Sequence, residues 1–168
     1  MRYTPAAVAL ALVAAVSASV SHSTPQLPMN PRAAALVAEG RAALESGQVD
    51  SAVDAYEAAL TIQPGSATIL LHLADATRRQ GMQGKALHYY RAAIEQEPAN
   101  VLAIAGEGAA LVEKGALEKA RRNLSRLKTL CGDDCDATRQ LAAAIARGPV
   151  TRIVTAEAVK PEPVVSDN

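Results

Sequence analysis

The chain has 168 residues, 17 basic and 17 acidic side chains, no Trp, no Phe and abundant alanine. Near-neutral charge argues against a nucleic-acid binder, which usually carries a basic stripe and a high pI, and against electrostatic attraction to an anionic membrane. A chain rich in alanine and poor in aromatic residues is typical of closely packed helices rather than of a wide ligand pocket.

The first segment, residues 1–18, has the pattern of a secretory signal peptide. Arg2 and the amino terminus are positively charged, an apolar run of eleven residues covers 6–16, and small residues lead to an expected cleavage site after Ala18. This run is shorter than the roughly 20 apolar residues of a membrane-spanning helix. An uncleaved anchor is the alternative. We therefore expect a periplasmic or secreted protein with no membrane span after signal cleavage.

Residues 19–30 are rich in Ser and Pro and are expected to form a flexible lead-in. The spacing of apolar residues and helix breakers then predicts seven helices, at 31–46, 49–62, 66–80, 83–96, 100–114, 116–130 and 134–147. Asn30, Ser66 and Asn100 are suitable N-cap residues. The pattern stops after Gly148, and residues 148–168 are expected to form a disordered tail, with pairing to a partner's sheet edge or folding back into a groove as alternatives.

A period of 34 residues runs through the helical region. Positions one period apart carry small or helix-ending residues: Gly40, Ala74 and Gly108; Gly47, Gly81 and Gly115; Ala52, Ala86 and Ala120; Pro64, Pro98 and Gly132. A fixed period of this length indicates one helical hairpin that is repeated and stacked. We expect the first of these sets to face the third where the two helices of each hairpin cross, and larger residues, including Tyr56 and Tyr90, to fill the layers between hairpins.

These residues resemble the tetratricopeptide repeat family over residues 33–147. The second copy shows the likeness best: Leu70, Leu73, Ala74, Gly81, Ala86, Tyr90, Ala93 and Pro98. The third copy is degenerate and carries Leu124 in place of the aromatic residue. The resemblance implies an all-α solenoid of about three helix-turn-helix repeats plus a C-terminal capping helix, occupying residues 31–147. Together with the signal pattern, it suggests a short secreted bacterial member of the family.

The resemblance also implies a concave groove, lined by the first helix of each hairpin, that holds a peptide or partner segment. The groove positions carried over from the family are Arg41, Glu45, Leu71, His72, Asp75, Arg78, Arg79 and Arg139, with Val37, Leu102, Ala105, Ala109 and Glu113 beside them. One interpretation is that the arginines bind acidic side chains or a C-terminal carboxylate. The other is a solvated face of Arg–Glu and Arg–Asp pairs. The family's specialised clamp for a chaperone C-terminus is not expected, because its Lys and Asn positions are held by Val37, Arg41, His72, Leu102 and Gly106.

Cys131 and Cys135 are the only cysteines. In an oxidising compartment an even pair predicts a disulfide, here between the last hairpin and the capping helix. Gly132 would reverse the chain, and Asp133 or Asp134 would cap the next helix. A redox-active pair lacks the two-residue spacing of thioredoxin-like motifs, and a metal site would lack a histidine, so both remain as weaker alternatives.

No nucleophile, phosphate loop or His-x₃-His metal motif can be placed on the sequence. Gly106 and Gly108 form a Gly-x-Gly pair, but inside a predicted helix, which favours packing. We therefore expect no catalytic residue, no metal, no cofactor and no nucleic-acid partner. The predicted function is a non-enzymatic scaffold or adaptor for protein interaction outside the cytoplasm. The alternatives are a self-associating structural module and a redox-active protein acting through Cys131 and Cys135.

Overall fold

The computed structural model describes residues 28–149, which contain seven α-helices. The helices are α1 (Pro31–Glu45), α2 (Val49–Ile62), α3 (Ala67–Arg79), α4 (Gln83–Gln96), α5 (Val101–Glu113), α6 (Leu117–Cys131) and α7 (Asp136–Arg147). Each predicted helix is confirmed, with its ends within two residues of the expected ones. The predicted signal peptide, most of the lead-in and the tail after Pro149 lie outside the described residues.

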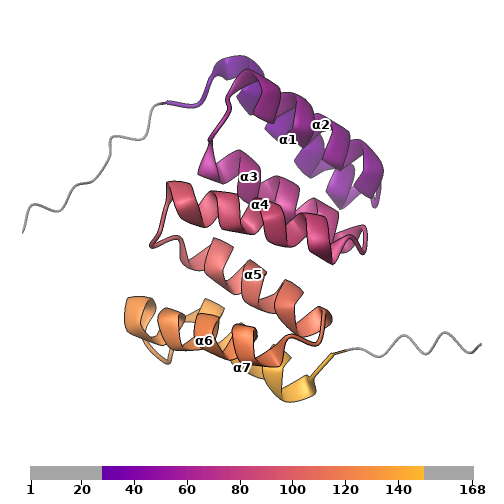
Figure 1. Cartoon of the computed structure of the whole chain (residues 1–168). Helices are drawn as coiled ribbons and strands as arrows, with labels where there is room; N and C mark the ends of the chain where they lie inside the picture. The colour runs from indigo at the N-terminus through magenta and orange to yellow at the C-terminus, as the bar shows by residue number, and fades with distance from the viewer. Residues whose placement is uncertain (1–27, 150–168) are drawn as a thin grey trace, which may run out of the picture.

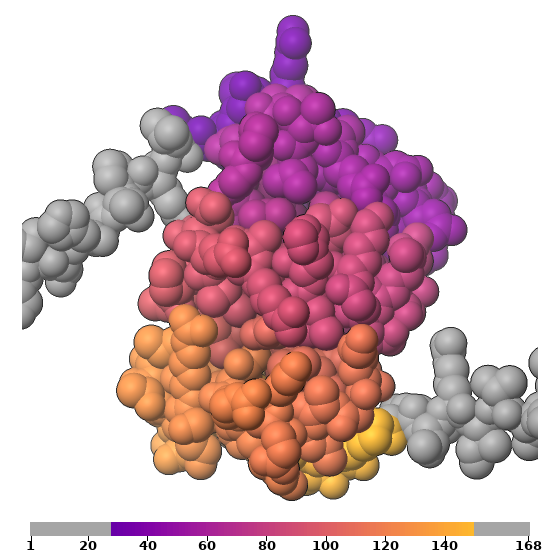
Figure 2. Space-filling view, in the orientation of Figure 1, coloured from indigo at the N-terminus to yellow at the C-terminus, as the bar shows by residue number. Residues whose placement is uncertain are grey.

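The helices stack as hairpins in chain order (Figure 1). The pairs α1–α2, α3–α4 and α5–α6 are the three hairpins, and α7 packs against both α5 and α6 as the capping helix. The space-filling view shows successive bands of colour along the stack, so each hairpin touches mainly its neighbours in sequence (Figure 2). This is the solenoid that the period predicts.

The helix starts follow the expected N-caps in three places. The side chains of Asn30, Ser66 and Asn100 accept hydrogen bonds from the backbone N–H groups at the starts of α1, α3 and α5. The predicted N-cap of α7, Asp133 or Asp134, is wrong. Its N-cap is Cys135, with no side-chain cap, because the helix begins at Asp136, two residues later than expected, and leaves Asp133 and Asp134 outside its first turn.

Each hairpin turn depends on a glycine with positive φ. Gly47, Gly81 and Gly115 have φ of 78°, 83° and 75°, in the left-handed region that disfavours a side chain. The two residues after each C-cap donate back to the carbonyls of the last turn, as Gly47 N does to Leu44 O and Gln48 N to Ala43 O. This Schellman arrangement satisfies carbonyls that a helix end leaves unpaired. The same backbone conformation therefore closes each of the three hairpin turns.

Tyr56 of α2 and Tyr90 of α4 are the largest fully buried side chains in the described residues. Tyr56 belongs to an N-terminal cluster with residues of α1 and α3, and Tyr90 to a cluster that reaches from α3 to α7. Burying an aromatic side chain of this size contributes about 1.5–3 kcal/mol. The layers between hairpins form the core of the stack, as three clusters of buried residues.

The glycines inside helices have different neighbours from those expected. A Cβ added to Gly40 would meet the Tyr56 ring, 2.5 Å from Cε1, before any atom of Ala52. A Cβ on Gly108 would meet Leu141 of α7, 2.5 Å from Cδ2, rather than Ala120. Gly106, which was assigned to packing, lies against the Tyr90 ring. These glycines therefore make room for large side chains, not for a second small residue.

Candidate functional site

Two hollows follow the first helices of the hairpins. The larger, of about 360 Å³, lies between α3, α5 and α7 and is lined by Leu71, His72, Asp75, Arg78, Leu102, Ala105, Gly106, Ala109, Asp136, Ala137, Gln140 and Leu141. The smaller, of about 240 Å³, lies between α1 and α3 and is lined by Arg41, Leu44, Glu45, Tyr56, His72, Asp75 and Arg79. The two share His72 and Asp75, so they are adjacent parts of one surface.

The predicted groove residues line one of these hollows, except Val37, Glu113 and Arg139. Arg139 instead bonds the residues at the start of its own helix: its guanidinium donates to the carbonyl oxygen of Asp134 at 2.7 Å and to the carboxylate of Asp136. The face of α7 that closes the larger hollow carries Gln140 and Leu141. Val37 also differs from expectation, since it is 7% exposed and belongs to the N-terminal core cluster.

Seven lining residues are not expected from the sequence: Leu44, Tyr56, Gly106, Asp136, Ala137, Gln140 and Leu141. Leu44 stands one period before Arg78, so the repeat phase itself could have found it. Tyr56 was assigned to the layer between hairpins, where its ring does lie. Nothing in the sequence indicates that Tyr56 also lines a hollow.

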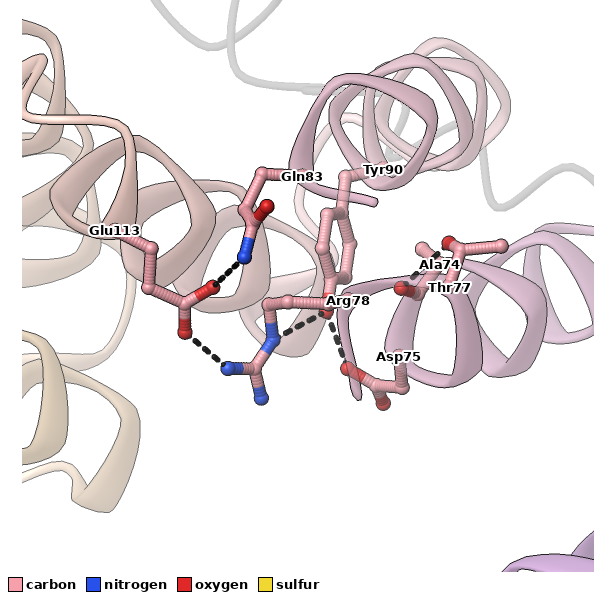
Figure 3. A network of polar contacts seen from close by, with 7 residues as sticks. All are labelled: Ala74, Asp75, Thr77, Arg78, Gln83, Tyr90 and Glu113. Atoms are coloured by element: carbon pink, nitrogen blue, oxygen red, sulfur yellow. Dashed lines mark hydrogen bonds and ion pairs between the residues drawn. The ribbon is translucent and has the colours of Figure 1, made fainter. Parts of the chain in front are cut away.

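A polar network ties Tyr90 to the first helices of two hairpins (Figure 3). The Tyr90 hydroxyl donates to the Asp75 carboxylate and accepts from Arg78 Nε at 3.4 Å. Arg78 Nη1 also pairs with Glu113 Oε1 at 2.6 Å, and Gln83 Nε2 donates to Glu113 Oε2 at 3.5 Å. Burial, and after it the Asp75 charge, raise the pKa of Tyr90, so this hydroxyl stays protonated. Arg78 is therefore already engaged within the fold.

Tyr56 is the counterpart of Tyr90 one period earlier, yet its hydroxyl has no such partners. Among residues 28–149 its oxygen is buried and makes no hydrogen bond. The positions that correspond to Asp75 and Arg78 are Arg41 and Leu44, which offer no acceptor. The ring stacks on His72, with centroids 5.4 Å apart and planes at 16°. Burial raises the pKa of Tyr56, while the nearby charges of Arg41 and Arg79 oppose the rise.

The charges around Tyr56 are only partly paired. Within the described part of the chain, Arg41 and Arg79 make no hydrogen bond or ion pair, in contrast to Arg78. His72 is half-buried, and burial lowers its pKa, with Asp75 opposing the shift and Arg41 adding to it. His72 is therefore uncharged at neutral pH, and the free positive charge of the smaller hollow comes from the two arginines.

The two cysteines are joined in the structure. Cys131 and Cys135 form a disulfide with a Cα–Cα distance of 5.7 Å, and Cys131 Sγ lies 3.6 Å from Thr138 Oγ1 of α7. The bridge closes the turn between α6 and the capping helix. Across residues 28–149, no group of three or more His, Cys, Asp or Glu side chains is arranged to hold a metal ion.

No helix between residues 28 and 149 has both the length and the apolar character to span a bilayer.

Comparison with known proteins identifies the repeat. The sequence profile of the tetratricopeptide repeat family matches residues 6–67 and 37–83, the first match beginning inside the predicted signal peptide. A search of curated proteins gives no match.

Several solved structures share the fold. The Sgt2 tetratricopeptide repeat domain from Aspergillus fumigatus has 25% identity and a TM-score of 0.65, over 83% of this chain and 91% of that one. The TPR2B domain of yeast Sti1, in a pHsp70 complex, has 19% identity and a TM-score of 0.66, over 70% and 96%. The first such domain of Spaghetti (RPAP3), bound to the HSP90 peptide SRMEEVD, has 23% identity and a TM-score of 0.61, over 68% and 94%.

Proposed function

This chain belongs to the tetratricopeptide repeat family, and we propose that it is a non-enzymatic scaffold or adaptor whose first helices bind a peptide or partner segment. The observation that carries the proposal is the pair of adjacent hollows along α1, α3 and α5. Two of the similar structures are complexes: the Spaghetti (RPAP3) domain is bound to an HSP90 peptide, and the TPR2B domain of yeast Sti1 is in a pHsp70 complex. A pre-formed surface of this kind binds with little reorganisation.

The larger hollow suits an apolar side chain of the partner. Leu102 on α5 is 62% exposed, and Leu71, Ala105 and Ala109 lie beside it. Apolar side chains left in water at a concave surface gain free energy when a partner covers them. We infer that this hollow supplies most of the apolar contact and that the charged smaller hollow supplies selectivity.

We place this activity outside the cytoplasm. The support is the signal-peptide pattern of residues 1–18 and the pairing of Cys131 with Cys135, which suits an oxidising compartment. Cell fractionation followed by N-terminal sequencing of the mature protein tests it. A mature protein that begins near Ser19 supports the proposal, and a cytoplasmic protein that retains Met1 contradicts it.

Site-specific photo-crosslinking tests the groove directly. The photoreactive residue p-benzoylphenylalanine replaces Leu102 in the larger hollow or, as the matched control, the exposed Arg122 on α6. Irradiation of living cells should give an adduct with a partner protein from position 102 and none from position 122. Charge reversal of Arg78 is a poor test of binding, because Arg78 bonds Tyr90 and Glu113 and its loss would disturb the fold.

The same experiment separates the alternatives. An adduct whose mass equals two copies of the chain would favour the self-associating module, and light scattering over a concentration series would measure that association. Equal adducts from both positions would contradict the groove assignment. For the redox alternative, a reduction potential of the Cys131–Cys135 pair below about −300 mV would mark the bridge as structural.

A further inference from the structure

We propose that the disulfide between Cys131 and Cys135 makes the larger hollow able to bind, because it holds α7 in the position where that helix forms one wall of the hollow. Partner binding then requires the oxidised chain, and the hollow is completed only where the two thiols can pair. The inference rests on the proposed function, since it concerns the regulation of the same surface.

The first support is the place of α7 in the site. Asp136, Ala137, Gln140 and Leu141 line the larger hollow, and the other lining residues belong to α3 and α5. All four lie in the first half of α7, and the disulfide joins the end of α6 to the residue immediately before this half. A displacement of the start of α7 therefore changes the shape of the hollow.

The second support is how few contacts of its own hold α7 in place. The helix has 12 residues, a length at which an isolated helix is marginal in water. Leu141 is its only large apolar side chain that is buried, whereas α3 buries Ile69, Leu70 and Leu73. The N-cap residue Cys135 makes no side-chain cap hydrogen bond. The disulfide is therefore a large part of what fixes the start of α7.

The third support is a buried hydroxyl on α7. Thr138 is 2% exposed, and among the described residues the hydrogen-bond partner of its side chain is Cys131 Sγ, at 3.6 Å. A disulfide sulfur carries no hydrogen, so the Thr138 hydroxyl is the donor. A buried polar group without a partner costs free energy. Opening the disulfide frees this sulfur to move away, so the hydroxyl of docked α7 depends on the bridge as well.

The chemistry needs only a disulfide oxidant. The two thiols give up two electrons and two protons as the S–S bond forms, and the disulfide of the oxidant takes them up and becomes a dithiol. Thiols stay reduced in a reducing cytoplasm and pair in an oxidising compartment. The bridge then acts through position alone, with no redox turnover. Closing so short a loop should favour the docked position of α7 by about thirtyfold.

Hydrogen exchange of the full-length protein measures the docking of α7. The variant Cys131→Ala/Cys135→Ala removes the bridge without adding a cap. We expect its α7 amides to exchange about thirtyfold faster than in wild type, while the α3 amides keep their rates and show that the hairpins remain folded. Wild type that is reduced with dithiothreitol after folding should behave in the same way, and it decides the question if the variant fails to fold. Unchanged exchange of α7 in the reduced protein overturns the proposal.

A matched variant distinguishes position from thiol chemistry. Cys135 has φ of −65° and ψ of 136°, the extended conformation of an N-cap residue. In Cys131→Ala/Cys135→Ser the Ser hydroxyl can accept from the first turn of α7 and should recover about fivefold of the lost protection, although no disulfide can form.

Photo-crosslinking from position 102 then connects docking with binding. The bridged protein should give the partner adduct, Cys131→Ala/Cys135→Ala should lose most of it, and Cys131→Ala/Cys135→Ser should recover a part. An adduct of equal yield from Cys131→Ala/Cys135→Ala overturns the role of the bridge and leaves the proposed function standing. If the bridged protein itself gives no adduct, the proposed function fails, and this inference fails with it.

Discussion

Two tyrosines one period apart show how the same scaffold leaves a buried hydroxyl without a partner in the first hairpin and satisfies one in the second. The Tyr56 and Tyr90 rings are both fully buried, and both lie against a glycine of a first helix. The Tyr90 hydroxyl bonds Asp75 and Arg78, whereas the Tyr56 hydroxyl bonds no residue of the described chain. The apolar part of the repeat is thus nearly constant, while its polar part differs in each copy.

This difference follows from what each part of a tyrosine side chain requires. A ring needs only apolar surroundings, which every hairpin supplies, but a hydroxyl needs a partner at hydrogen-bond distance. In the second hairpin that partner is an acid on α3, and the network continues to Glu113 on α5. In the first hairpin the equivalent position carries the cation Arg41, so the Tyr56 hydroxyl is left without an acceptor.

The largest difference in stability between the Tyr56 and Tyr90 sites should come from adding a methyl group beside each tyrosine ring. A Cβ on Gly106 would lie 2.5 Å from Tyr90 Cζ and 2.8 Å from its hydroxyl oxygen. Since the hydrogen bonds hold this ring in place, Gly106→Ala should lower the free energy of unfolding by about 1–3 kcal/mol. Gly40→Ala crowds the Tyr56 ring in the same way, but no hydrogen bond anchors that ring, so the loss should be smaller.

Urea denaturation measures both effects. The control is Gly84→Ala on α4, where an added Cβ meets no atom within 4 Å. That change should raise stability by about 0.5–1 kcal/mol through helix propensity alone. Equal losses for Gly106→Ala and Gly40→Ala would show that the hydrogen bonds of Tyr90 do not restrain its ring.

The second-largest difference in stability should come from removing the hydroxyl of each tyrosine. Tyr90→Phe leaves Asp75 without its donor and should lower the free energy of unfolding by about 1–2 kcal/mol. Tyr56→Phe removes a hydroxyl that bonds nothing in the fold and should leave stability unchanged or slightly raised. Thermal and urea unfolding of the two variants check this. A loss in Tyr56→Phe as large as that in Tyr90→Phe would mean that Tyr56 has a partner in solution.

Transferring the acid from the second hairpin to the first should make the two sites alike. Arg41→Asp places a carboxylate at the position equivalent to Asp75, and the Tyr56 hydroxyl should then donate to it. We expect a gain of about 0.5–1 kcal/mol, reduced somewhat because the new acid stands one helical turn from Glu45. Arg41→Ala, which removes the charge without adding an acceptor, is the control. A double-mutant cycle with Tyr56→Phe should cancel the gain, and a gain that survives would have another cause.

The smallest effect should be a pH dependence of the stability that arises from His72 beside Tyr56. Burial lowers the pKa of His72 below 6.5, so the folded protein binds this proton more weakly than the unfolded chain. Stability should therefore be complete above about pH 6.5 and fall as the pH drops below it. His72→Phe keeps a ring against Tyr56 and should flatten that part of the profile, which urea unfolding between pH 5 and pH 8 would show. An unchanged slope would assign the dependence to another group.

Much of the fold could be predicted because its signals are local. Cap residues such as Asn30 and turn glycines such as Gly81 act on backbone groups a few residues away, and the helix ends came within two residues. The start of α7 was the least accurately predicted helix end. Three aspartates surround the disulfide turn, and the sequence alone does not say which of them lies inside the helix. Arg139 lies outside both hollows for a related reason: its bonds to Asp134 and Asp136 depend on where α7 begins.

The 34-residue period was sufficient to determine that this protein is a stack of helical hairpins, because a repeated apolar pattern can be buried only against its own neighbours. Tertiary structure alone decided which buried hydroxyl is satisfied. The partners of Tyr90 come from another helix, 15 and 12 residues away in the chain, and whether Asp75 or Arg41 meets a tyrosine depends on how two helices are rotated about each other. A hydrogen bond fails over about an ångström, whereas apolar burial tolerates such a shift, so the repeat pattern predicts the core far better than the site.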